Sequence, residues 1–230
     1  STRSIPRWTD CVVQLSVDES LQRIDTPQNR LILGVVGAVI FIALVVYLVR
    51  ALRARAADKR LHESIVSVAL EYLQNVLIPD GNGAALHVDY LLLTSRGLVV
   101  IDLRSQRGNI FGGDQMTEWT VMSGASRTTF LNPQHALYDR VAAVRALAGD
   151  LPVEGRILFT RRARFPKGLP RWTLMVDALH SEFPPVGSDT GRDWLENFRS
   201  EWQAVVEAAA PSPLRRRRGF LAEVFNAQLF

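Results

Sequence analysis

An uninterrupted apolar run of nineteen residues near the N-terminus most constrains how this chain folds. Residues 31–49 read LILGVVGAVIFIALVVYLV, without a charged or strongly polar side chain. Because a helix rises about 1.5 Å per residue, this run covers nearly the hydrocarbon thickness of a bilayer. A buried core helix normally shows a polar stripe, and a signal peptide would be followed by small residues, whereas arginines follow here. We therefore predict a single transmembrane helix.

The charges on the two sides of this run predict its orientation. Five basic residues lie within residues 50–60, whereas Arg23 and Arg30 are the basic residues among the twenty before the run. Since short cytoplasmic flanks are enriched in Lys and Arg, residues 1–30 should form a short extracytoplasmic head. Residues 50–60 are then a basic juxtamembrane collar. We predict localisation to the cell inner (plasma) membrane, single-pass, with the C-terminal domain in the cytoplasm.

The head and the membrane helix suggest little about partners. Residues 11–15 favour a short strand within the head. Cys11 is the only cysteine, so no disulfide partner exists within the chain. Gly34 and Ala38 form a pair of small residues four apart, which predicts a homodimer through the transmembrane helix.

The rest of the chain has the size and composition of one α/β domain. Hydrophobic residues make up 47% and charged residues 22% of the chain, which allows a buried core. We predict a mixed sheet flanked by helices, restriction-endonuclease-like in class, over residues 61–210, followed by a tail over 211–230. The expected helices are residues 61–76, 132–147 and 192–209, the last capped by Asp189 or Thr190. The expected strands are residues 86–93, 98–103, 119–122, 128–131, 156–160 and 172–176.

Acidic residues interrupt two of these apolar strands. Asp102 and Arg104 are two residues apart, so their side chains share one face of a strand. Asp89 breaks the preceding run, and Glu63 lies on the helix before it. Carboxylates that converge at one end of the sheet would suit Mg²⁺. The alternative is a structural ion pair between Asp102 and Arg104, with Glu63 a solvated helix residue.

Several segments in order resemble the NERD family, the nuclease-related domain of the PD-(D/E)xK restriction-endonuclease-like superfamily. HVDYLLLTSRGLVVIDLRSQRGNIFGG resembles the family's strand Asp, its next strand and its glycine turn. The Trp before the family's next strand is matched by EWT. Its helix that begins with Asn-Pro is matched by NPQHALYDRVAAVRALAG, and a later apolar strand is matched by RILFTRRARF. The similarity covers residues 60–182.

This resemblance implies a site and an activity. It implies Glu63, Asp89 and Asp102 as carboxylates that face a metal, with Arg104 where the family usually has Lys. The implied cofactor is Mg²⁺, and the implied reaction is hydrolysis of a phosphodiester in DNA or RNA. Arg is a poor replacement for Lys in such a site. The alternative is therefore a catalytically degenerate NERD domain that acts as a membrane-bound module for binding nucleic acid or protein.

Two basic stretches lie outside that site. The first is a loop suited to nucleic-acid phosphates, although a solvated loop is the equal alternative; its residues are Arg161, Arg162, Arg164 and Lys167. The second precedes apolar residues at helical spacing and is predicted to lie on the anionic membrane surface; its residues are Arg215, Arg216, Arg217 and Arg218. Packing onto the domain is the alternative for this tail, with nucleic-acid binding third.

Overall fold

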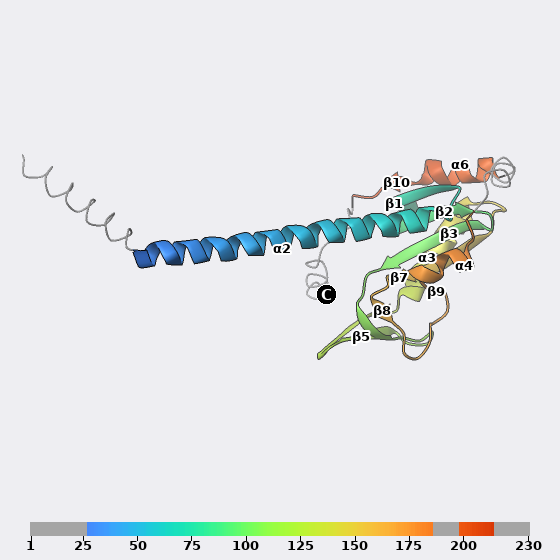
Figure 1. Ribbon diagram of the computed structural model, residues 1–230. Coiled ribbons are helices and arrows are strands. Elements are labelled where there is room, and N and C mark those ends of the chain that lie inside the picture. Colours follow the sequence, from blue (N-terminus) through green and yellow to red (C-terminus); the bar gives the residue numbers. More distant parts are fainter. Residues whose placement is uncertain (1–26, 186–197, 214–230) are drawn as a thin grey trace, which may run out of the picture. The chain divides into compact units, whose positions relative to one another are not determined.

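The computed structural model describes residues 27–185 and 198–213 (Figure 1). The chain divides into two compact units, residues 1–59 and 60–230, and each is described by itself. Three predicted features lie outside the described residues: the strand at 11–15, the cap at Asp189 or Thr190, and the basic tail that begins at Arg215.

Helix α2 (Pro27–Val66) contains the apolar run. From Leu31 onward it is long and apolar enough to cross a membrane, and the side chains of its most apolar stretch are not buried in the protein. Exposed apolar side chains on every face of a helix are the pattern expected of a helix surrounded by lipid. By length and composition α2 is therefore a candidate membrane span.

The sequence prediction of a helix over residues 61–76 is wrong in its second half. Helix α2 ends at Val66, and residues 71–79 form strand β1 (Glu71–Pro79), which pairs antiparallel with β2 (Ala85–Thr94). The apolar positions 68, 72 and 76 are four apart, and four is also a multiple of the two-residue period of a strand. Pairing with β2 satisfies the backbone of β1 and buries Val76 and Ile78.

The main sheet has six strands in the order β10-β1-β2-β3-β7-β9. Strands β1, β2 and β3 form an antiparallel run, and β7 and β9 continue it in parallel. The strands expected at residues 86–93 and 98–103 are thus present as the antiparallel pair β2 and β3. The remaining bounds are β3 (Gly97–Arg104), β7 (Val153–Phe159), β9 (Thr173–Met175) and β10 (Ala210–Pro211).

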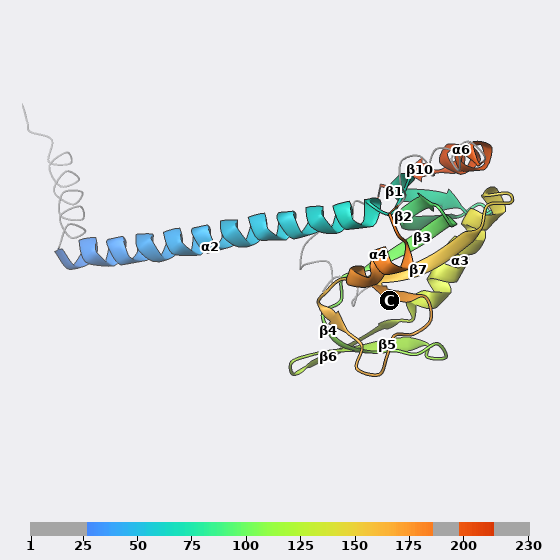
Figure 2. The same ribbon diagram turned by 45° about the vertical axis from the view of Figure 1, so that its right-hand side comes forward.

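Helices cover both faces of this sheet (Figure 2). On one face lie α3 (Pro133–Leu147) and α6 (Arg199–Ala208), which bury Leu137, Val144 and Trp202. On the other face, Ile65 at the end of α2 packs with Leu92, Ile101 and Leu179, the last from α4 (Leu179–Glu182), which follows the short helix η1 (Val176–Ala178). The predicted mixed sheet flanked by helices is confirmed.

A second sheet was not foreseen as a separate unit. Its order is β6-β5-β4-β8, with β4 (Gly108–Phe111), β5 (Glu118–Ser123), β6 (Ser126–Leu131) and β8 (Ala163–Arg164). Its inner face places Ile110, Trp119 and Val121 in the core shared with α3. Its outer face is largely exposed, as expected of an antiparallel sheet that packs on one side.

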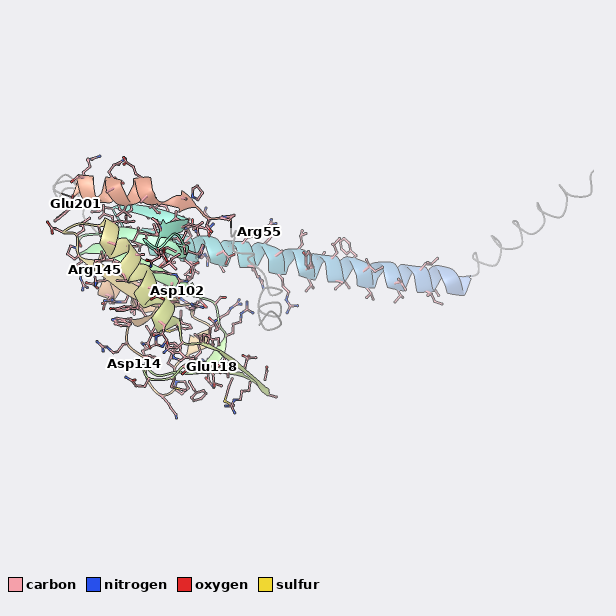
Figure 3. All side chains as sticks on the ribbon, turned by 180° about the vertical axis from the view of Figure 1, so that it is seen from behind. Arg55, Asp102, Asp114, Glu118, Arg145 and Glu201 are labelled. Carbon is pink, nitrogen blue, oxygen red and sulfur yellow. The ribbon has the colours of Figure 1, made fainter. Side chains whose placement is uncertain are left out.

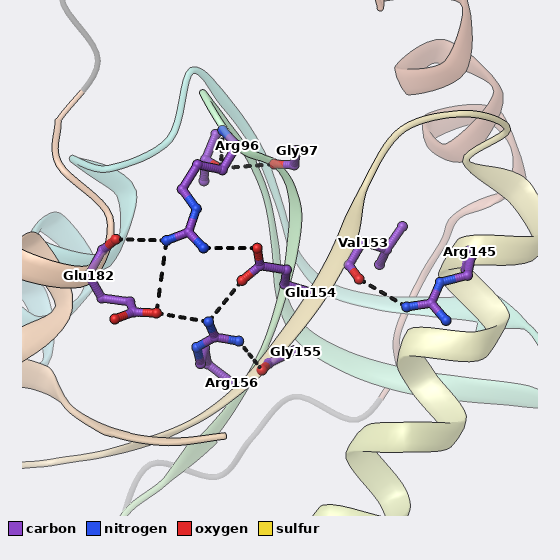
Figure 4. Close-up of polar contacts among 9 residues, drawn as sticks. Arg96, Gly97, Arg145, Val153, Glu154, Gly155, Arg156 and Glu182 are labelled. Carbon is purple, nitrogen blue, oxygen red and sulfur yellow. Dashed lines mark hydrogen bonds and ion pairs between the residues drawn. The ribbon is translucent and has the colours of Figure 1, made fainter. Parts of the chain in front are cut away.

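Four charged side chains form a closed network between the β2–β3 turn, β7 and α4 (Figure 4). Arg96 and Arg156 each pair with Glu154, at 3.0 and 2.8 Å, and Arg156 also reaches Glu182 at 2.8 Å. Both guanidinium groups lie within 5.3–5.4 Å of the Phe183 ring centre. The network fixes α4 to the sheet, and the Arg156 hydrogen bond, followed by the charges of Arg156 and Arg96, lowers the pKa of Glu182.

The lowered pKa of Glu182 predicts an acid-sensitive contribution to stability. Its carboxylate stabilises the fold above its usual pKa of about 4.5, and this contribution is lost as the pH falls through the lower folded value. We expect Glu182→Gln to cost about 0.5–1 kcal/mol at pH 7, because the side chain is partly exposed. Urea unfolding of the full chain in detergent, followed by tryptophan fluorescence from pH 3 to 7, measures this. A loss at pH 7 that persists unchanged at pH 3 would contradict it.

Gly155 lets α3 approach β7 closely. A Cβ atom at residue 155 would lie 2.6 Å from Val141 Cγ2 and 3.0 Å from Leu137 Cγ. We expect Gly155→Ala to destabilise the fold by about 1–3 kcal/mol through overpacking. Gly113→Ala is the matched control, because its Cβ would meet only the Met116 side chain at ordinary contact distance. Equal unfolding midpoints for the two variants would show that α3 can shift at no cost.

Candidate functional site

Two aspartates lie where the β2–β3 ladder ends. The last paired residues there are Tyr90 and Ile101, so Asp89 and Asp102 occupy the next positions on neighbouring strands. The Asp89 Oδ2 atom accepts a hydrogen bond of 2.8 Å from the Leu103 backbone N–H. Both carboxylates are largely buried, with 14% of the Asp89 and 5% of the Asp102 side chain exposed.

Two arginines hold the Asp102 carboxylate. Arg104 donates to Asp102 Oδ2 from Nε at 3.1 Å and from Nη2 at 2.6 Å. Arg140, which comes from α3, donates from Nη1 to the same oxygen at 3.4 Å and from Nε to the His87 carbonyl at 2.6 Å. Asp102 lies beside α3 (Figure 3), so its partners come from its own strand and from the covering helix. The structural ion pair that the sequence left open is present.

The four groups nearly cancel in charge. Asp89 and Asp102 contribute two negative charges, and Arg104 and Arg140 contribute two positive charges. The carboxylate of Asp89 also lies 4.0 Å from His87 Nδ1, and His87 Nε2 lies 2.7 Å from Asn75 Oδ1. Because a divalent cation is held by an excess of carboxylate or carbonyl oxygens, this set has little negative charge left for it.

Glu63 does not join these aspartates. It is exposed on α2, and the neighbouring Ile65 packs on the sheet face that carries Tyr90 and Ile101. Asp102 instead contacts α3, which covers the opposite face. Within residues 27–185 and 198–213, no group of three or more His, Cys, Asp or Glu side chains is placed to hold a metal ion. The described residues therefore show no three-carboxylate Mg²⁺ site.

The basic loop divides into paired and exposed cations. Arg161 forms an ion pair with Asp177, so its charge is neutralised. Arg162 and Arg164 are exposed, and the Lys167 Nζ atom lies 6.0 Å from the centre of the Phe111 ring. Of the four predicted nucleic-acid residues, these last three present charge to solvent.

Arg164 belongs to a row that crosses the second sheet. Strand register aligns Arg127 with Met122, Met122 with Asn109, and Asn109 with Arg164. Directly aligned residues point to the same face of a sheet, and all four are exposed. Sequence reasoning missed Arg127 and Arg140. Residues 126–131 read SRTTFL and show no alternation that would place Arg127 on a face, and nothing local to Arg140 indicates that it meets Asp102.

The order of elements and the place of the acids define a class. The domain contains an antiparallel run of strands, a helix and a parallel strand. Asp89 lies on β2, and Asp102 and Arg104 lie two residues apart on β3. This arrangement is that of a restriction-endonuclease-like α/β domain. Residues 54–160 match the family model described as "Nuclease-related domain", NERD, which confirms the resemblance found in the sequence. This region, a little under half of the chain, is therefore similar to the nuclease-related domain family.

A curated relative and the solved structures add little detail. The chain is 24% identical over 89 residues to an uncharacterized protein of Bacillus anthracis. That alignment covers 39% of this chain and 42% of the relative, so the chain spans less than half of the relative's length. No solved structure matches the chain.

The contacts of Arg140 predict that it stabilises the acid cluster. Arg140→Gln removes the positive charge beside buried Asp102 and the hydrogen bond to the His87 carbonyl. We expect a loss of about 1–3 kcal/mol in the free energy of unfolding. Arg127→Gln, at an exposed position of β6, should change it by less than about 0.5 kcal/mol. Urea unfolding of the two variants in parallel measures the difference, and equal values would refute the role of Arg140.

Proposed function

We propose that this chain is a membrane-tethered nuclease-related domain that binds nucleic acid and does not cleave it through a Mg²⁺ site. The observation that carries the proposal is the pairing of Asp102 with Arg104 and Arg140. In a metal-dependent site this carboxylate would face the cation. Here one of its oxygens accepts from two guanidinium groups, and Glu63 lies on another face.

The two arginines around Asp102 are poorly suited to a metal-dependent site. A guanidinium group stays protonated at all relevant pH values and cannot act as a neutral base toward water. Removing Asp102 from its partners to bind Mg²⁺ would leave Arg140, only 19% exposed, without its charge partner. The cluster is better suited to hold β3 and α3 together than to release a carboxylate for catalysis.

Nucleic-acid binding is supported by the outer face of the second sheet. Arg127 and Arg164 stand three strand spacings apart, about 14 Å, with Asn109 between them. Guanidinium groups match phosphate geometry, and the amide of Asn109 adds donors and an acceptor. Among the described residues, no carboxylate forms an ion pair with Arg127, Arg162 or Arg164. This face therefore offers uncompensated charge to a polyanion.

The apolar run supports the tether. In the proposed arrangement residues 31–49 cross the inner membrane, and the basic residues 50–60 keep the domain in the cytoplasm, where nucleic acid is present. Contact of Gly34 and Ala38 with a second copy would make the tether a homodimer. The tail that contains Arg215 to Arg218 would add contact with anionic lipid.

Binding and cleavage are separated with the full chain in detergent and labelled DNA and RNA. We expect salt-dependent binding without cleavage in Mg²⁺ or Mn²⁺. The double variant Arg127→Gln with Arg164→Gln should weaken binding several-fold on every sequence, and the slope of log affinity against log salt should fall by about 2. Arg199→Gln, an exposed arginine on α6, is the matched control and should change neither quantity.

Two outcomes would contradict this proposal. Cleavage that requires a divalent metal and is abolished by Asp102→Asn would support the alternative, a metal-dependent nuclease; that reading retains the adjacent positions of Asp89 and Asp102 in its favour. If the chain shows salt-dependent binding to neither DNA nor RNA, the proposed nucleic-acid function is wrong.

A further inference from the structure

A pocket of about 300 Å³ lies beside the first turns of α3, apart from the Asp102 cluster. Its wall combines exposed rings with polar side chains and comes from the β4–β5 loop, α3 and the segment before β9. Two of the residues that line it, Arg171 and Trp172, lie beyond the residues that match the nuclease-related family. The lining includes Asp114, Gln134, Tyr138, Asp139, Arg171 and Trp172.

Trp172 has an unusual backbone conformation at this pocket. Its φ angle is +58°, in the left-handed region that bulky residues rarely adopt. The residue is 41% exposed, although a tryptophan usually buries most of its surface. A large ring that is held in an unfavourable backbone conformation and is left partly open to solvent is typical of a binding site.

Hydrogen bonds from three elements hold this backbone in place. The Arg171 N–H donates to Asp114 Oδ1 at 2.9 Å, and the Arg171 carbonyl accepts from Gln134 Nε2 at 2.9 Å. The Trp172 carbonyl accepts from the Ile157 N–H at 2.7 Å. Gln134 is buried and also donates to Asp114 at 2.7 Å. The backbone that carries the Trp172 ring is thus held in place by hydrogen bonds.

The charge of the pocket limits what it binds. Asp114 and Asp139 disfavour a phosphate, and the Gln134 amide and the Arg171 N–H lower the pKa of Asp114, so that it stays ionised. Arg171 already places its guanidinium carbon 5.4 Å from the Trp172 ring centre, which disfavours a second cation there. With phosphates and cations disfavoured, the ligand that fits this pocket is a neutral, flat group with polar edges. Tyr138, 63% exposed, offers a second ring.

We propose that this pocket binds one unpaired nucleobase, stacked on Trp172, while the arginines of the second sheet hold phosphates of the same strand. The inference rests on the proposed nucleic-acid binding and assigns a base-binding site to it. Stacking on an aromatic ring tolerates any base, because every base has a flat π-face. A base inside a duplex is stacked on its neighbours and cannot enter, so the pocket selects single strands.

The test measures binding of the full chain in detergent to three probes: a labelled single-stranded DNA, the corresponding duplex, and inorganic polyphosphate. Trp172→Gly removes the ring and keeps a residue that tolerates positive φ, so the fold should be retained. We expect it to weaken single-strand binding about tenfold, the effect of losing one stacked base. Binding to duplex and polyphosphate should be unchanged, and Trp172→Phe should retain part of the single-strand affinity. Leu169→Ala, exposed in the same loop, is the matched control.

The outcomes separate this inference from the function on which it rests. If Trp172→Gly binds single strands as wild type does, while Arg127→Gln with Arg164→Gln weakens them, the pocket is not a base site and the nucleic-acid function stands. If Trp172→Gly weakens all three probes equally, the ring acts on the fold and the inference fails. If the unmodified chain binds no nucleic acid, both proposals fail.

Discussion

The close approach of α3 to β7 at Gly155 is the constraint on which the rest of the domain depends. Without a side chain at this position, Leu137 and Val141 lie directly on the parallel strand. The same helix then brings Arg140 to Asp102 and Gln134 to the Trp172 segment. Six residues of helix, about 9 Å, separate these last two contacts. One rigid element therefore positions both the acid cluster and the pocket.

Local signals in the sequence predicted much of this fold. The apolar runs at residues 86–93 and 98–103 predicted β2 and β3, and the Asn-Pro at 132–133 predicted the start of α3, where the Asn132 side chain accepts from the Gln134 N–H. Strand β1 was missed because apolar residues four apart fit a helix and a strand equally well. Pairing with β2, which is tertiary information, decided between them.

The candidate site was predictable only in part, for the same reason. Asp102 and Arg104 share a strand, so their pairing follows from the two-residue period. Arg140 is 38 residues away on another element, and its contact with Asp102 depends on how α3 crosses the sheet. Glu63 was named from the family pattern, and it is exposed on α2 beside Ile65, which packs on the face opposite α3. The match over residues 54–160 shows which family this region is similar to, while the contacts of Asp102 with Arg104 and Arg140 come from the structure alone.

The double hold on Asp102 has a consequence for redesign. Replacing Arg104 with Lys would restore the motif usual on β3, yet Arg140 would still donate to the same carboxylate from α3. Freeing that carboxylate oxygen therefore needs one change on a strand and another on a helix. Because either arginine alone still occupies the oxygen, neither single substitution leaves it open.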